Sequence, residues 1–174
     1  MQPRRVVITG LGPITPIGIG VAALWEGLRR RQSAVRCITR FDPTAFKSRI
    51  AGEVDGFHPS DYIEERRTRR LDRYSQFSIA ATRLALADSE IDLGGEDLDR
   101  VGAMMGTALG GVAHGERQYH NFLRGGVREV DPALALTVFA GAASCNIAIE
   151  FGCTGPNSTN GMSCASGAIA IGEG

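Results

Sequence analysis

A strand-like stretch runs directly into a run of small residues at Cys164, and this junction constrains the fold more than any other feature of the chain. The stretch from Asn157 to Ser163 has an extended character and ends at the cysteine. Small and aliphatic residues then continue as far as Gly172. A helix with such small side chains can pack closely against its neighbours on several sides. We therefore expect a thin, buried helix that begins at Cys164 and lies between two layers of secondary structure.

Strand-like and helix-like segments alternate along the rest of the chain. Apolar residues with helical spacing and one highly charged segment predict helices over about residues 21–28, 61–72, 77–88, 113–123 and 140–151. Runs of β-branched or small apolar residues predict buried strands at 5–9 and 101–107. Such alternation is typical of an α/β fold with a largely parallel sheet.

Composition and charge argue against several classes of function. The chain has 19 basic and 19 acidic residues, and a net charge of zero argues against bulk electrostatic binding to nucleic acid or to an anionic membrane. No stretch approaches about 18 uninterrupted apolar residues, so we predict neither a transmembrane helix nor a secretory signal.

The cysteines and histidines point to a reducing cytoplasm and to no metal site. The four cysteines form no CxxC pair, and the three histidines have no metal-ligand spacing. We expect Cys37, Cys145 and Cys153 to be free thiols buried as small apolar side chains.

The position of Cys164 suits a nucleophile. A thiol at the N-terminus of a helix lies beside unpaired backbone N–H groups and the positive end of the helix dipole. Both favour the thiolate, which is the form that attacks carbonyl carbon. From this residue alone, a buried and inert thiol remains the alternative. A serine hydrolase that uses Ser163 is another, because residues 161–165 approach the GxSxG pattern.

Four short motifs occur in an order that resembles one enzyme family. They are Arg5-Val6-Val7-Ile8-Thr9-Gly10-Leu11-Gly12, the pairs Phe41-Asp42 and Ala51-Gly52, Gly106-Thr107-Ala108-Leu109-Gly110-Gly111, and Gly155-Pro156 followed after seven residues by Cys164-Ala165-Ser166-Gly167. Over its full length the chain is similar to the N-terminal half of a β-ketoacyl-acyl carrier protein synthase of the fatty-acid-elongating (KAS II) type.

This resemblance implies a thiolase-like fold with layers in the order α-β-α-β-α. Residues 1–174 would form the N-terminal β-ketoacyl synthase domain, with a mixed, largely parallel five-stranded sheet and helices on both faces. The helix-like run that reaches Gly174 leads us to expect that the chain is truncated. In the family, two catalytic histidines, a lysine and the second oxyanion donor belong to the other half.

The resemblance also implies a condensing acyltransferase without a bound cofactor. Cys164 would take an acyl chain from acyl carrier protein as a thioester, and its own backbone N–H would be one oxyanion donor. A malonyl group on the carrier would then lose CO2, and its carbanion would attack that thioester. Fatty acid and polyketide synthesis are both open. A carrier-binding partner of the chain-length-factor kind, without catalysis, is the alternative.

Further site residues follow from the same resemblance. Carrier docking would use Arg66, Arg69, Arg70 and Arg128, although a solvated helix face is an alternative reading of the basic run. The acyl pocket would be lined by Leu109, Val138, Phe139 and Met162, although ordinary core packing is an alternative for Leu109. We also expect a homodimer through the strand before Cys164, in which Asn160 and Gly161 lower the strand propensity.

We predict that the 174-residue chain alone does not condense malonyl-carrier with acyl-carrier, because the implied histidines belong to the other half. The measurement is product formation by the purified chain, with an intact synthase as the positive control. Turnover without any added C-terminal half would contradict the prediction.

Overall fold

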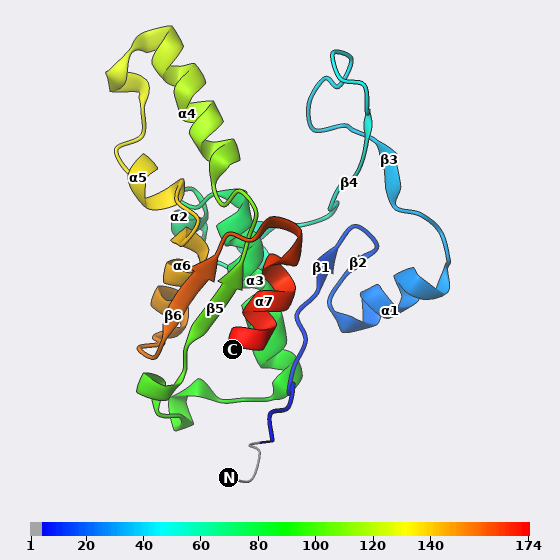
Figure 1. The fold of residues 1–174 in the computed structure, drawn as a ribbon, viewed down its shortest axis with the longest axis vertical. Coiled ribbons are helices and arrows are strands. Elements are labelled where there is room, and N and C mark those ends of the chain that lie inside the picture. Colours follow the sequence, from blue (N-terminus) through cyan, green and yellow to red (C-terminus); the bar gives the residue numbers. More distant parts are fainter. Residues whose placement is uncertain (1–4) are drawn as a thin grey trace. The chain divides into compact units, whose positions relative to one another are not determined.

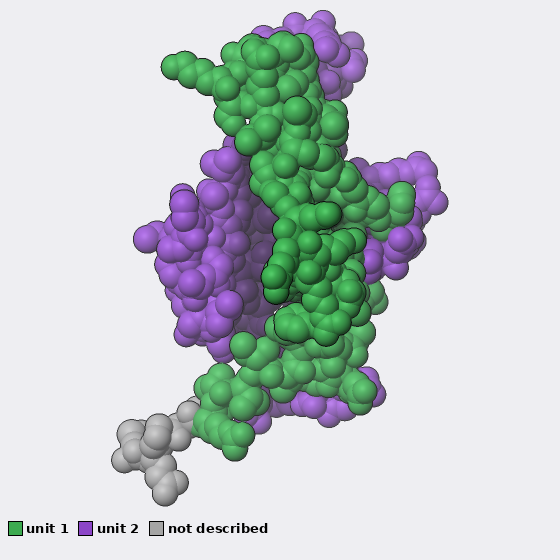
Figure 2. Space-filling view, turned by 90° about the vertical axis from the view of Figure 1, so that its right-hand side faces the viewer, with its two compact units in different colours: residues 1–58, 83–91 green, residues 59–82, 92–174 purple. Residues whose placement is uncertain are grey.

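The computed structural model of this chain describes residues 5–174. They form two compact units, coloured separately in Figure 2. One unit contains residues 5–58 together with 83–91, and the other contains 59–82 and 92–174. Helix α3 (Arg73–Ser89) contributes to both. Within residues 5–174, no helix has the length and apolar character needed to cross a lipid bilayer.

The first unit is built from two small antiparallel ribbons, one complete helix and the last part of α3 (Figure 1). The ribbons pair β1 (Ile14–Thr15) with β2 (Gly18–Ile19) and β3 (Val35–Cys37) with β4 (Ile50–Gly52). Helix α1 (Val21–Arg29) packs closely on the first ribbon at its buried Gly27. A Cβ on this glycine would lie only 2.4 Å from the carbonyl oxygen of Ile17.

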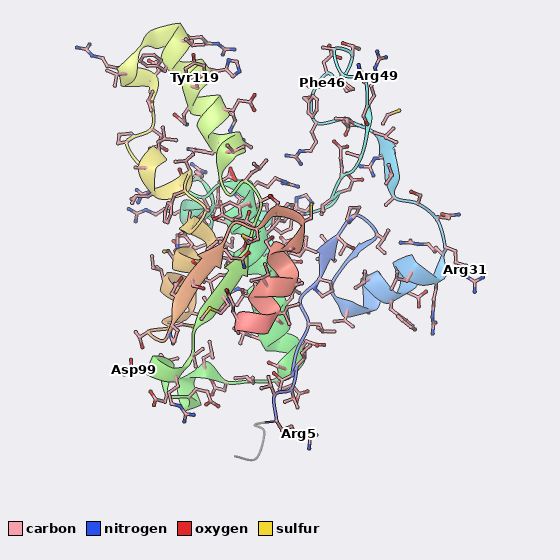
Figure 3. The ribbon with its side chains drawn as sticks, in the orientation of Figure 1. Arg5, Arg31, Phe46, Arg49, Asp99 and Tyr119 are labelled. Atoms are coloured by element: carbon pink, nitrogen blue, oxygen red, sulfur yellow. The ribbon has the colours of Figure 1, made fainter. Side chains whose placement is uncertain are left out.

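Polar contacts hold the loop that joins β3 to β4. Arg49 donates hydrogen bonds to the carbonyl oxygens of Phe46, at 3.3 Å, and Thr44, at 2.9 Å (Figure 3 labels Arg49 and Phe46). The buried carboxylate of Glu53 accepts hydrogen bonds from the hydroxyl and the N–H of Thr39. The hydroxyl bond is the main cause that lowers the pKa of Glu53.

The second unit contains the parallel strands. β5 (Ala103–Gly106) pairs with β6 (Asn157–Asn160) in a register that runs from Ala103 opposite Asn157 to Gly106 opposite Asn160. The further helices are α2 (Glu65–Thr68), α4 (Val112–Gly125), α5 (Leu134–Thr137), α6 (Ala142–Phe151) and α7 (Ser166–Glu173). Short 3₁₀ segments lie at η1 (Pro59–Asp61), η2 (Leu93–Gly95), η3 (Leu98–Arg100), η4 (Val127–Glu129) and η5 (Ser163–Ala165).

Helices cover both faces of this strand pair. On one face, Ile79 of α3 and Ile147 of α6 pack with Ala103 in the apolar core. On the other face, α7 begins against Gly106, whose missing side chain leaves room for the carbonyl oxygen of Ser166. Because successive residues of a strand point to opposite faces, the alternation in β5 decides which helix each residue meets.

The α/β class is confirmed, but the predicted five-stranded sheet is not what the described residues form. The only parallel pair within residues 5–174 is β5 with β6, and the other strands form two-stranded antiparallel ribbons. The buried strand predicted at residues 5–9 was wrong, because this run is not a strand and Val6 is 84% exposed. A β-branched run becomes a strand only when its backbone finds a partner, and this one finds none among the described residues.

Helix boundaries also differ from the predicted ones in informative places. The charged segment 61–72 forms only one short helix, α2, and the helix predicted at 140–151 begins at Ala142 after the separate turn α5. The helix expected to begin at Cys164 starts instead at Ser166. That helix is not buried as expected, since one face packs on β5 while Ile171 on it is 74% exposed.

We predict that Gly106→Ala destabilises the second unit by about 1–3 kcal/mol, the usual range for overpacking. The added Cβ would lie 2.1 Å from the carbonyl oxygen of Ser166, so the start of α7 would have to move. Denaturant unfolding measures the loss. Gly172→Ala in α7 is the matched control, because its Cβ would meet open space. Equal midpoints for the two variants would contradict the close approach.

Candidate functional site

Cys164 lies in the turn between β6 and α7. The turn follows Asn160, and the 3₁₀ segment η5 leads into the eight-residue helix α7. The Cys164 thiol is exposed rather than enclosed in the core. The strand-to-helix junction predicted from the sequence is therefore present, and the thiol is open to a substrate.

The backbone around Cys164 is strained and leaves one donor unused. Ser163 has φ +51°, in the left-handed region that costs a residue with a side chain about 1 kcal/mol or more. The N–H of Ala165 donates to the carbonyl oxygen of Met162 at 3.2 Å. Within the described residues, the N–H of Cys164 donates no hydrogen bond. A free N–H at this point can stabilise an oxyanion that forms on a carbonyl bound to the cysteine.

The strand pair brings a second segment to the same edge as Cys164. β5 and β6 are parallel, so the chain leaves both strands at the same end of the strand pair. The N–H of Thr107 donates to the carbonyl oxygen of Asn160 at 3.1 Å, which extends the pairing by one bond. Leu109, two residues further along, is 70% exposed. The glycine-rich segment with Leu109 and the turn with Cys164 therefore start from neighbouring points.

The structure brings three of the four predicted pocket residues to one place. The segment with Val138 and Phe139 packs against the glycine-rich segment, since a Cβ on Gly111 would lie 3.0 Å from the Cα of Val138 and one on Gly110 would lie 3.5 Å from the carbonyl carbon of Phe139. Leu109 directly precedes these glycines. Met162, the fourth, lies in the turn before Cys164 and is exposed.

Tyr74 positions this cluster, and sequence reasoning missed it. Its hydroxyl donates to the carbonyl oxygen of Ala140 and accepts from the N–H of Ala143 at 2.8 Å, which ties α3 to the turn after Phe139. Burial is the main cause that raises the pKa of Tyr74, so its hydroxyl keeps its proton at neutral pH. These partners lie far away in sequence, and no local pattern announces them.

Phe139 also lines a pocket of about 450 Å³. Its walls are mostly apolar and include the guanidinium groups of Arg67 and Arg70. The other lining residues are Leu71, Ala133, Leu136, Thr137, Phe139, Cys145, Asn146 and Ile149. The pocket combines apolar surface with the guanidinium group of Arg70, while that of Arg67 is paired with Glu150.

The basic cluster divides into arginines with different partners. Arg66, Arg69 and Arg70 are exposed on α2 and just after it, and Arg69 pairs with Glu65 at 2.6 Å. Arg67 instead forms an ion pair with Glu150 of α6. Arg128 is exposed in η4, which follows α4. Three predicted docking residues thus form one exposed group, and the fourth comes from a separate segment.

The other cysteines differ from the prediction. Cys37 and Cys145 are exposed and Cys153 is half-buried, so the expectation of buried side chains was wrong. The small size of a cysteine side chain does not reveal whether its position in the fold is buried. In the part of the chain that the structure describes, no three His, Cys, Asp or Glu side chains gather into a group that could hold a metal ion.

Comparison with known proteins supports the resemblance seen in the sequence. Residues 3–174 match the family described as "Beta-ketoacyl synthase, N-terminal domain". The 3-oxoacyl-[acyl-carrier-protein] synthase 2 of Staphylococcus aureus (strain N315) is 34% identical over 172 residues, which are 99% of this chain and 42% of the relative. The chain therefore spans less than half the length of this relative.

Solved ketosynthases share the fold. The ishigamide ketosynthase/chain length factor matches with a TM-score of 0.82 and 33% identity over 98% of this chain and 45% of that one. The AntDE:AntF complex, described as a type II PKS acyl-carrier protein with its ketosynthase bound to the hexaketide, matches with a TM-score of 0.81 and 26% identity over 96% of this chain and 44% of that one.

The strand-to-helix junction at Cys164, the glycine-rich segment after β5 and these similarities agree with one another. The implied family is confirmed: the chain belongs to the β-ketoacyl synthases and corresponds to their N-terminal domain.

Proposed function

We propose that this chain carries the nucleophile of a decarboxylating condensing enzyme, and that Cys164 is that nucleophile. The observation that carries the proposal is an exposed thiol in the turn directly before α7, beside its own unbonded N–H. Exposure lets a carbonyl group approach the sulfur, and the unbonded N–H can donate to the oxygen of that carbonyl group.

The first step is acyl transfer to Cys164. The thiolate attacks the carbonyl carbon of an acyl thioester on acyl carrier protein and forms a tetrahedral intermediate. The N–H of Cys164 donates to the oxyanion of that intermediate. The carrier's sulfur then leaves as a thiolate and takes a proton from water, and the acyl group stays on Cys164 as a thioester.

The second step forms the new carbon–carbon bond. A malonyl thioester on the carrier loses CO2, and the electron pair of the broken bond becomes an enolate. That enolate attacks the acyl-Cys164 carbonyl, and the bond to sulfur breaks, so the Cys164 thiolate is regenerated. The groups that stabilise the enolate would come from the C-terminal half that relatives possess.

Acyl carrier protein is the proposed partner. Its family is acidic, and the exposed group of Arg66, Arg69 and Arg70 offers complementary charge. A carrier bound to its ketosynthase is the subject of the AntDE:AntF structure, which supports this pairing. Leu109, Val138 and Phe139 are proposed to face the acyl chain, which in relatives serves fatty acid or polyketide synthesis.

A second copy of the chain is proposed to pair with β6. Among the described residues, β6 pairs only with β5, so its other edge has unpaired backbone groups. Such an edge is a template for another strand.

Ser163 gives a specific reason to keep a hydrolase as the second candidate. Its φ of +51° at a strand-to-helix turn is the kind of strain found at serine-hydrolase elbows. Cys164 is favoured because it directly follows that strained position and its thiol is exposed beside an unbonded N–H. A fluorophosphonate probe that reacts at Ser163 would reverse this preference.

We predict that iodoacetamide at pH 7 modifies Cys164 at least about tenfold faster than Cys37 or Cys145, because the proposed nucleophilic role requires a reactive thiol. Cys37 and Cys145 are exposed thiols of the same chain and serve as internal controls. Peptide mass spectrometry over time gives the three rates. Equal rates would favour the alternative of a carrier-binding partner without catalysis.

We predict that the double reversal Arg66→Glu with Arg70→Glu weakens binding of acyl carrier protein about tenfold and reduces its salt dependence. Fluorescence anisotropy with labelled carrier at several salt concentrations measures both effects. Arg29→Glu, an exposed reversal in α1, is the control and should leave binding unchanged. Equal loss in the control would show that net charge, rather than this patch, attracts the carrier.

A further inference from the structure

The side chain of Asn160, the last residue of β6, connects three parts of the backbone around Cys164. Its amide nitrogen donates to the carbonyl oxygen of Ser166, at 3.1 Å, and more weakly to that of Met105, at 3.4 Å. Its amide oxygen accepts from the N–H of Met162 at 3.3 Å. One side chain thus bonds to β5, to the turn two residues before Cys164, and to the helix two residues after it.

The direction of these bonds requires an amide. Two of the partners are carbonyl oxygens, which need donors, and the third is an N–H, which needs an acceptor. A carboxylate of the same shape accepts only and would face two carbonyl oxygens, and an aliphatic side chain would leave all three groups without this partner. Asn160 is therefore matched to its position by chemistry as well as by size.

The polar residues of β6 divide between its two faces. Asn157 donates to the carbonyl oxygen of Ser144 at 3.1 Å, and the Thr159 hydroxyl donates to the Ser144 hydroxyl at 2.9 Å. These residues fix α6 to the sheet. Asn160 points to the opposite face, where α7 begins. The two asparagines thus do similar chemistry on one strand, but only Asn160 contacts the turn that contains Cys164.

We propose that Asn160 is a positioning residue for Cys164, whose side-chain amide clamps the two ends of the turn 161–165 and so fixes the thiol and its backbone N–H at the start of α7. The inference rests on the proposed nucleophilic role of Cys164. The strained Ser163 lies inside the clamped turn, and a strained residue persists only when its surroundings hold it. Release of the clamp lets the turn relax and moves the thiol away from the helix start.

The test uses four single variants of the whole chain. Asn160→Asp keeps the shape and the acceptor but removes the donors, and Asn160→Ala removes all three bonds. Asn157→Asp and Asn157→Ala are the matched controls on the same strand. The readout is the rate at which 2,2′-dipyridyl disulfide modifies Cys164 relative to Cys37 in the same molecules, measured well below the melting temperature of each variant.

We expect both Asn160 variants to slow the modification of Cys164 about tenfold relative to that of Cys37. Both Asn157 variants should lower the melting temperature with little change in the ratio of the two rates. If Asn160→Ala does not fold, the isosteric Asn160→Asp variant decides. In this variant, the slowing of Cys164 modification relative to Cys37 should also become smaller below about pH 4, where the new carboxyl gains a proton and can donate again. A change in packing alone would not follow that titration.

Two results would overturn the inference. The first is a Cys164 rate that stays fast in both Asn160 variants, or falls equally in the Asn157 variants; the nucleophile proposal would then stand and the clamp would not. The second is that, in the chain without any substitution, Cys164 reacts no faster than Cys37. That outcome removes the proposed function itself, and the inference falls with it.

Discussion

The close approach of α7 to β5 at Gly106 is the constraint on which the rest of the site depends. Parallel pairing places Gly106 opposite Asn160, at the edge where both strands end. The absent side chain of Gly106 lets the carbonyl oxygen of Ser166 come near enough for Asn160 to bond to it. A larger residue in this place would push α7 outward and separate the helix start from the turn that it must complete.

The polar sequence of β6 is a consequence of this arrangement. Asn157 and Asn160 lower strand propensity, yet β6 pairs with β5 along its whole length, from Asn157 to Asn160. Side-chain bonds to Ser144 on one face and to Ser166 on the other compensate for the missing apolar packing. Strand propensity reflects how a side chain fits its surroundings, so hydrogen-bond partners on both sides can replace β-branched residues.

Local patterns revealed the junction at Cys164, whereas contacts distant in sequence were hidden. Strand-like and small-residue runs are visible in a window of a few residues, so the turn and the following helix could be predicted. Tyr74 reaches Ala140 across 66 positions, and nothing local signals that bond. The run from Val6 to Ile8 has the composition of a strand, but composition cannot say whether a partner is present. For Asn160, the sequence showed a weak strand former and could not show which carbonyl oxygens lie opposite it.

Burial also decides how the four neighbouring arginines can be used. In sequence they are equivalent, but Arg67 pairs with Glu150, whose side chain is only 11% exposed, while Arg69 pairs with the exposed Glu65. An exposed pair contributes little, so Arg69 can exchange Glu65 for a carboxylate on a partner at small cost. If Arg67 did the same, a largely buried carboxylate would lose this charged partner. Arg67 therefore anchors α2 to α6, and binding of an acidic partner is left to the arginines around it.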